Sequence, residues 1–252
     1  MTQARRLVPA VPSWQNRVVA LTEYRKKRRF SVTSEPAGAT RPRRRSSKLS
    51  FVVQKHRATQ LHYDFRLEWG GVLLSWAVPK GPSLDPTVKR LAMQVEDHPL
   101  EYANFEGIIP EGEYGGGTVM VWDRGTYVPE AADVGEAVRK GDLKFALHGK
   151  KLGGSWVLVR THGRSSPGAP GRSWLLIKHR DEAATTTDVT ETEPRSVISG
   201  RILAQIALDE GGDVVKASSG DPEEEVRALL EKPLVPARRR RKPAVWHSKA
   251  VS

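Results

Sequence analysis

The stretch that decides the fold is Leu61-His62-Tyr63-Asp64-Phe65-Arg66-Leu67-Glu68, in which apolar and polar residues alternate. Successive side chains of a β-strand point to opposite faces, so this stretch predicts a strand with one apolar and one polar face. Seven more short runs are rich in β-forming residues: 51–53, 72–78, 91–95, 118–122, 143–147, 156–159 and 174–177. Eight short strands between glycine-rich turns are typical of a barrel or a sandwich. We expect an all-β (mainly β) fold, a compact closed β-barrel of about eight strands.

The chain divides into three parts by composition and periodicity. Residues 1–48 form a basic, mostly irregular arm with one helical turn near 18–24, residues 49–182 form the barrel domain, and residues 183–252 form a linker, short peripheral helices and a basic tail. Helical periodicity is present at 134–140, at 200–208 with Ser199 as N-cap, and at 223–231 with Asp221 as N-cap and Pro222 at the first position.

Composition excludes several classes of protein. The 252 residues contain no cysteine, which rules out disulfides, thiolate zinc sites, iron–sulfur clusters and cysteine nucleophiles. No apolar run reaches the roughly 18 residues of a membrane span, and the N-terminus lacks the apolar segment of a secretory signal. We therefore expect a cytoplasmic monomer that does not contact membranes.

The net charge of +12 lies at the two ends of the chain. Residues 1–50 carry 13 Lys/Arg against 2 Asp/Glu, and residues 237–252 carry 6 Lys/Arg and no acidic residue. Basic runs of this kind bind nucleic acid by releasing counterions from phosphates. A basic tail that is simply solvated is the alternative, and the presence of three basic runs, at 25–29, 41–45 and 238–242, favours nucleic acid.

The polar face of the first strand points to a metal. His62 and Asp64 are alternate residues, about 6.6 Å apart along a strand, and can converge on one ion with bonds of about 2.1 Å. His56 is the third ligand if the connection 57–60 folds its strand back alongside. Two histidines and one carboxylate suit Mn²⁺, Fe²⁺, Zn²⁺ or Co²⁺. The alternative is an exposed strand face whose histidines only satisfy their neighbours.

A second strand, 89–98, carries another polar set. If Leu91, Met93 and Val95 face inward, the opposite face holds Arg90, Gln94, Glu96 and His98. Together with Arg66 and Lys80, this face predicts a phosphoryl-binding pocket, and salt bridges to Glu96 or Glu68 are an equally good interpretation. The glycine-rich run 110–117 lacks a Walker lysine, which favours a tight connection over a phosphate loop.

Several ordered motifs together resemble one known family, the 3′-phosphoesterase module of bacterial ATP-dependent DNA ligase D. The resemblance covers roughly residues 20–182. The matching stretches are FVVQKH (51–56), LHYDFRL (61–67), SWAVPKGPS (75–83), VEDHPL (95–100), FEG (105–107), IPEG (109–112), WDRG (122–125) and WLLIKH (174–179).

This resemblance implies a small β-barrel that uses Mn²⁺, with Co²⁺, Zn²⁺ or another divalent ion as alternatives. The implied activity is trimming of DNA or RNA/DNA primer-template 3′ ends, by removal of a terminal ribonucleoside and then of the 3′-phosphate. Carried over by position, the metal ligands are His56, His62 and Asp64. The catalytic positions are His98, Arg66, Tyr102, Lys80 and Arg90, and the substrate- or phosphate-binding set adds Arg28, Gln54 and Glu96.

The arm departs from the family pattern at one position. Arg28 and Glu35 match, but Arg29 stands where the family has an acidic residue, a change that bears on the ribonucleoside-removing step. We expect a stand-alone module, since 252 residues leave no room for ligase or polymerase domains; those activities, or Ku, would come from partner proteins. A non-catalytic nucleic-acid-binding protein and a two-His-one-carboxylate Fe(II) oxygenase are the alternatives.

Overall fold

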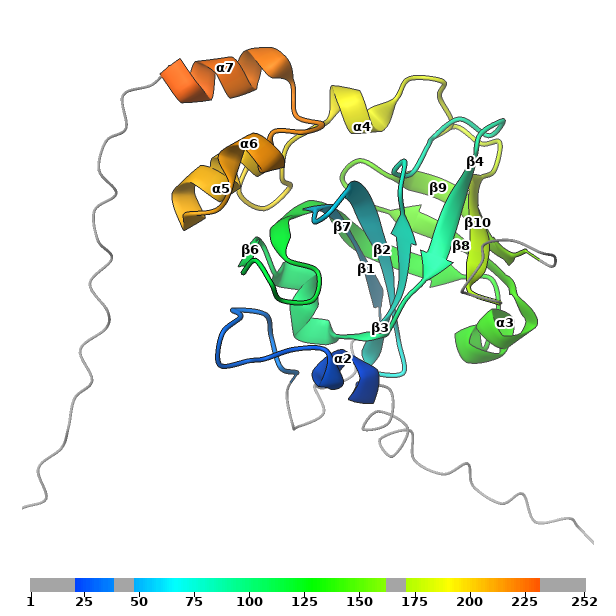
Figure 1. Ribbon diagram of the computed structural model, residues 1–252. Helices are drawn as coiled ribbons and strands as arrows, with labels where there is room; N and C mark the ends of the chain where they lie inside the picture. The colour runs from blue at the N-terminus through cyan, green and yellow to red at the C-terminus, as the bar shows by residue number, and fades with distance from the viewer. Residues whose placement is uncertain (1–20, 39–47, 162–170, 232–252) are drawn as a thin grey trace, which may run out of the picture.

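The computed structural model describes residues 21–38, 48–161 and 171–231 (Figure 1). The strands are β1 (Leu49–Arg57), β2 (Leu61–Trp69), β3 (Val72–Val78), β4 (Lys89–Gln94), β5 (His98–Pro99), β6 (Gly107–Ile109), β7 (Gly117–Pro129), β8 (Asp142–His148), β9 (Gly153–Arg160) and β10 (Ser173–Lys178). The helices are α2 (Thr22–Lys26), η1 (Leu100–Asn104), α3 (Val134–Lys140), α4 (Val189–Thr192), α5 (Leu203–Glu210), α6 (Val214–Ala217) and α7 (Glu223–Glu231).

Eight antiparallel strands close into a barrel. Their order is β1-β2-β3-β4-β10-β9-β8-β7, and pairing between β1 and β7 closes the sheet. These are the eight strands that the sequence predicts, so the closed mainly β fold is confirmed. Two short strands, β5 and β6, pair with β3 and β7 outside this circuit. Closure leaves no free sheet edge in the eight-strand circuit.

The barrel interior is filled by one face of each strand. Tyr63, Phe65 and Leu67 of β2 point inward, as the alternation predicts, and belong to the main core cluster. Large aromatic side chains complete it, and the fully buried tryptophans are Trp76, Trp122, Trp156 and Trp174. Burying this apolar surface, at about 25 cal/mol per Å², stabilises the barrel independently of the polar groups outside it.

A second apolar cluster lies outside the main core, on strands β1, β3 and β7. Leu21 and Tyr24 from the arm pack there with Tyr102 of η1, against Val52 and Val121 of the barrel. The described part of the arm, residues 21–38, therefore holds a short helix and packs on the barrel. Outside this helix, residues 27–38 form turns and irregular structure, and the bounds of the arm at 1–48 stay a prediction, since residues 1–20 and 39–47 lie outside the described part. The packing follows from Leu21 and Tyr24, whose apolar surface the basic composition of the arm conceals.

The helix predicted at 134–140 is confirmed. The Asp133 side chain accepts a hydrogen bond from Glu136 N (3.0 Å) at its start, and Gly141 ends it with φ of +85°. The helix predicted at 223–231 is confirmed as well. The one predicted at 200–208 begins late, because Gly200 adopts φ of +71°; α5 starts at Leu203 with Ile202, not Ser199, at the N-cap position.

The short C-terminal helices pack on the barrel. Leu203, Ile206 and Ala207 of α5 belong to the same cluster as the barrel interior. Asp221, predicted to cap α7, instead accepts a hydrogen bond from Ala204 N (2.9 Å) and pairs with Lys55 Nζ (2.9 Å). Both side chains of this ion pair are fully buried, so it fixes the segment to β1 beside His56. Figure 1 shows helices α4–α7 at the end of the molecule opposite α2.

None of the helices in the described ranges has the length and apolar character to cross a membrane.

Candidate metal centre and pocket

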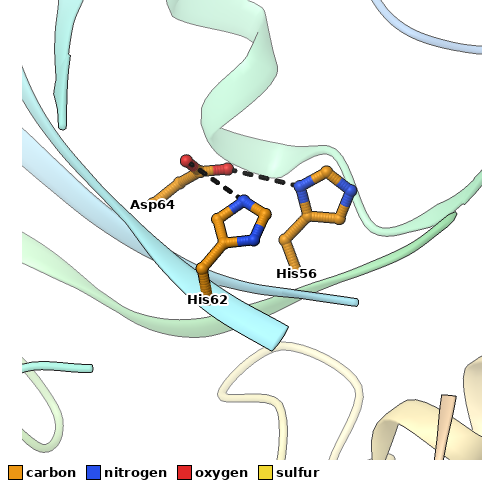
Figure 2. Close-up of side chains that lie close together, drawn as sticks. All are labelled: His56, His62 and Asp64. Atoms are coloured by element: carbon orange, nitrogen blue, oxygen red, sulfur yellow. Dashed lines mark ion pairs between the residues drawn. The ribbon is translucent and has the colours of Figure 1, made fainter. Parts of the chain in front are cut away.

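Three potential metal ligands meet where β1 and β2 pair. The register places His56 opposite His62, and Asp64 follows His62 by two residues on the same face. His56 Nδ1 lies 3.6 Å from Asp64 Oδ2, and His62 Nε2 lies 3.8 Å from Asp64 Oδ1, as the dashed lines of Figure 2 show. One ligand atom from each residue lies within 4.8 Å of the others. Atoms sharing an ion with bonds of about 2.1 Å lie roughly 3.0 to 3.4 Å apart, so a small inward movement completes the set.

Backbone carbonyls orient both imidazole rings. His56 Nε2 lies 2.8 Å from Gly115 O, and His62 Nδ1 lies 3.0 Å from Gln60 O. A carbonyl oxygen only accepts, so these ring nitrogens carry the protons and the opposite nitrogens present lone pairs towards Asp64. Hydrogen bonds of this kind orient metal-ligating histidines, and the donor set fits Mn²⁺, Fe²⁺, Co²⁺ or Zn²⁺.

The protonation states also suit a metal. Burial opposes ionisation of Asp64, but the Arg66 guanidinium at 2.9 Å and the two imidazoles outweigh it and hold the pKa of Asp64 far below its usual range. Burial, together with the positive charge of Arg66 and the neighbouring His56, lowers the pKa of His62 despite the opposing Asp64. Asp64 is therefore ionised and His62 neutral at pH 7, the forms that metal binding requires.

The Arg66 side chain is almost fully engaged by protein groups. It is 2% exposed, and its Nε donates to Gln54 Oε1 (2.8 Å), its Nη1 to Ser75 Oγ (2.8 Å) and its Nη2 to Asp64 Oδ2 (2.9 Å). Nη1 also lies 2.8 Å from His98 Nδ1. Few of its five N–H groups remain for a phosphate, so its main role in this structure is to hold Asp64.

His98 is buried and neutral. Its Nδ1 lies 2.9 Å from Glu96 O and 2.8 Å from Arg66 Nη1, and its Nε2 lies 3.2 Å from Arg28 Nη2. A ring protonated at Nδ1 donates to the carbonyl and accepts from Arg28, and its contact with Arg66 is then not a hydrogen bond, because a guanidinium only donates. Burial and the guanidinium groups of Arg66 and Arg28 lower the pKa of His98 well below its usual value. The rings of Tyr24 and Tyr102 lie edge-on against it, at 5.0 and 4.8 Å between centroids.

The arm contributes a charged wall to the same site. Arg28 Nε donates to Glu35 Oε1 (2.8 Å), which also accepts from the Tyr102 hydroxyl (3.0 Å). Arg28 Nη1 reaches Glu96 Oε1 (3.3 Å), and Lys27 Nζ reaches Glu96 Oε2 (3.1 Å). Arg28 and Glu35 have side chains that are 5% and 0% exposed, so this ion pair is part of the buried structure.

The loop between β6 and β7 forms the facing wall. Glu113 N donates to Pro110 O (3.2 Å) and Gly116 N to Glu113 O (3.0 Å), so the run 110–117 contains the tight turns that the sequence favours. It also supplies the Gly115 carbonyl that holds His56. Arg29, where the resemblance implies an acidic residue, pairs with Glu113 across the gap between arm and loop.

These elements enclose a pocket of about 330 Å³. Most of the predicted site residues line it together with a few apolar groups. The lining residues are Arg28, His56, Ala58, His62, Asp64, Arg66, Ala77, Val95, Glu96, His98, Tyr102, Ile109, Tyr114 and Gly115. The volume is at the lower end of the range for small-ligand sites, enough for one phosphate group and part of a nucleoside.

Three predicted residues lie outside this lining. Gln54 is fully buried behind the pocket, where its amide nitrogen donates to Phe105 O (2.9 Å). Lys80 is exposed. Arg90 Nη2 lies 3.8 Å from Asp188 Oδ2.

The faces of β4 are the reverse of those predicted. Ala92 belongs to the barrel core and Gln94 Oε1 accepts from the buried Trp174 Nε1 (3.1 Å), whereas Leu91 is 42% exposed. Arg90 therefore shares the inward face, near the end of the barrel. The strand ends at Gln94, after which Glu96 and His98 follow a different path into the pocket.

Sequence reasoning missed the contributions of Tyr24, Tyr114 and the Gly115 carbonyl. Tyr24 stacks on Arg28, with 3.9 Å from the guanidinium carbon to the ring centroid, and Tyr114 lines the pocket rim. An aromatic residue within a basic or glycine-rich run is the signal that could have identified the two tyrosines. The carbonyl is a backbone group and leaves no trace in the sequence.

Comparison with known proteins finds one family model and several relatives that agree with the resemblance seen in the sequence. Residues 54–160 match the family model described as DNA Ligase D 3′-phosphoesterase domain. The multifunctional non-homologous end joining protein LigD of Pseudomonas aeruginosa is 54% identical over 187 residues, which cover 73% of this chain and 22% of that protein.

Two further relatives match a similar part of the chain. The multifunctional non-homologous end joining DNA repair protein LigD of Mycobacterium tuberculosis is 48% identical over 143 residues, covering 57% of this chain and 18% of that protein. LigD of Mycolicibacterium smegmatis is 40% identical over 167 residues, covering 64% and 21%. The chain thus spans about a fifth of the length of these relatives.

Proposed function

Because this chain carries a DNA ligase D 3′-phosphoesterase domain, we propose that it is a metal-dependent phosphoesterase that processes the 3′ ends of DNA. Its substrates are primer-template 3′ ends that carry a terminal ribonucleoside or a 3′-phosphate. The names of its relatives link them to non-homologous end joining, which makes ligase, polymerase and Ku proteins its expected partners.

His56, His62 and Asp64 would hold the metal, for which Mn²⁺ is our first choice and Co²⁺ or Zn²⁺ are alternatives. When bound, such an ion polarises a phosphate oxygen and lowers the pKa of a coordinated water. The single observation that carries the proposal is this ligand set, oriented by two backbone carbonyls and lying beside buried Arg and His side chains in one pocket.

The remaining pocket residues bind and orient the phosphoryl group. Arg28 carries a permanent charge at the pocket wall, and Arg66 keeps Asp64 ionised and in place. His98 starts neutral, and a phosphate dianion beside it favours its protonated form, from which Nε2 can donate a proton to the leaving oxygen. Tyr102 donates its hydroxyl to Glu35, so it positions the arm. Lys80 and Arg90 remain proposed phosphate contacts from outside the observed lining.

A primer-template that ends in a 3′-phosphate or in one ribonucleotide tests the proposal. Purified protein with Mn²⁺ should release inorganic phosphate from the first and a nucleoside, leaving a 3′-phosphate, from the second, and EDTA should stop both reactions. Binding without turnover at any divalent metal would favour the non-catalytic nucleic-acid-binding alternative. Oxygen consumption with Fe²⁺ and a 2-oxoacid would favour the oxygenase, although the arginines of the pocket suit a phosphate better.

A further inference from the structure

One tyrosine of this chain is exposed, whereas the others are buried. Of its five tyrosines, Tyr24, Tyr63, Tyr102 and Tyr127 are at most 4% exposed, whereas Tyr114 is 49% exposed. Tyr114 also lines the pocket that contains the metal ligands. Exposed aromatic rings at the mouth of a pocket are suited to contact with an apolar or aromatic ligand group.

The position of Tyr114 is fixed from two sides. Its neighbour Gly115 accepts the hydrogen bond from His56, and consecutive Cα atoms are about 3.8 Å apart, so the tyrosine is anchored close to the metal ligands. On the other side, Lys27 Nζ donates to the Tyr114 hydroxyl (3.2 Å) and lies 4.5 Å from the ring centroid. The ring is therefore held in place before any ligand arrives.

Resting on the proposed function, we propose that Tyr114 is a specificity-determining residue on whose ring the terminal nucleoside of the 3′ end stacks. The pocket's cations and metal ligands account for recognition of the phosphate, and Tyr114 is the exposed aromatic ring among the lining residues. An aromatic ring can stack with any base, because every base has a π face.

The bridge from Lys27 explains why the stacked group is the terminal nucleoside. Lys27 joins Glu96 on one side to Tyr114 on the other, across the rim of the pocket. A strand that continued past Tyr114 would have to cross this bridge. A terminal nucleoside has no continuation, and it can lie against the ring while its phosphate lies at the metal ligands.

Binding can be measured without catalysis. A duplex with a 3′-terminal 2-aminopurine ribonucleoside is titrated with protein in EDTA, and stacking is followed as quenching of 2-aminopurine. Wild type and Tyr114→Phe should quench. Tyr114→Ala and the apolar control Tyr114→Leu should quench much less, with affinity for this end reduced about 5- to 100-fold. The residue is half-exposed, so these variants should keep the wild-type melting temperature. Equal quenching by wild type and Tyr114→Ala, or no quenching by wild type, overturns the proposal.

Kinetics with Mn²⁺ separate this proposal from the proposed function. Tyr114→Ala should lower kcat/KM for ribonucleoside removal at least about five times more than kcat/KM for removal of a 3′-phosphate, which has no terminal nucleoside to stack. Equal losses on both substrates overturn the stacking role while the phosphoesterase function stands. Tyr114-dependent quenching by a protein that cleaves neither end overturns the function and leaves the stacking role intact.

Discussion

The two faces of β2 are both buried, yet they depend on different parts of the molecule. Phe65 points inward to residues of the barrel's own strands, while its neighbours Asp64 and Arg66 point outward beneath the arm and η1. Apolar burial needs only bulk and shape, whereas a buried charge needs a partner at hydrogen-bond distance. The inward face is therefore self-sufficient, and the outward face works only when distant segments are in place.

Truncation on the inward face should have the largest effect on stability. We expect Phe65→Ala to lower the free energy of unfolding by about 3 to 5 kcal/mol, because it leaves a cavity among packed aromatic rings. Urea denaturation followed by tryptophan fluorescence measures this. Truncating the exposed Val128→Ala on β7 is the control and should change stability little. A loss below about 1 kcal/mol for Phe65→Ala would contradict the assignment of Phe65 to the core.

Substitution on the outward face should remove activity and leave the barrel folded. Asp64→Asn keeps the size and a hydrogen-bond acceptor for Arg66 but removes the charge of a metal ligand. We expect at least about a 100-fold loss of phosphate release, the scale on which loss of catalytic electrostatics is measured. His62→Ala should behave likewise. Wild-type turnover by either variant, with metal bound, would show that the reaction does not use this ligand set.

The buried ion pair between Glu35 and Arg28 should hold the arm against the outward face of β2. Glu35→Gln removes the charge opposite Arg28, and we expect the free energy of unfolding to fall by about 1 to 3 kcal/mol, together with lower turnover. Glu23→Gln is the matched control, because Glu23 belongs to an exposed ion pair with Lys26 in the same arm. Indistinguishable behaviour of the two variants would mean that the arm does not support the site.

Stability should depend on pH through His98, which lies beside Arg66 of the outward face. Because the pKa of His98 is lowered by burial and by Arg66 and Arg28, unfolding takes up a proton there, and stability is lost as pH falls below about 6.5, the unfolded value. Asp97, whose pKa burial and Glu96 raise to about 6, acts in the opposite sense. The free energy of unfolding of wild type and of His98→Gln is measured in EDTA from pH 8 to 5. The difference between the two curves isolates the contribution of His98. Parallel curves of the free energy of unfolding against pH would contradict a lowered pKa of His98.

The smallest effect is expected from the basic C-terminus, which lies outside the described residues. Removal of residues 238–252 should weaken duplex binding and lower the slope of log K against log salt by about 0.9 for each DNA phosphate that the tail neutralises. Turnover at saturating substrate should not change. Unchanged affinity and salt slope would identify the tail as a solvated end.

The local sequence pattern is sufficient to predict the barrel and the candidate metal ligands. Alternation along a strand is local information, so all eight strands and the polar face with His62 and Asp64 follow from it, and the short connection after His56 brings in the third ligand. The family resemblance adds Arg28 and Glu35 from the arm, whose contacts with the pocket the structure describes.

Long-range packing sets which groups meet around these candidate ligands. Arg28 and His98 are 70 residues apart, and no periodicity links them. On β4, alternation could not tell which face is inward, because Ala92 rather than the larger Leu91 fits the core. The Gly115 carbonyl that orients His56 is a backbone group, which every residue has. Local spacing determines which side chains share a face, and only long-range packing determines what covers it.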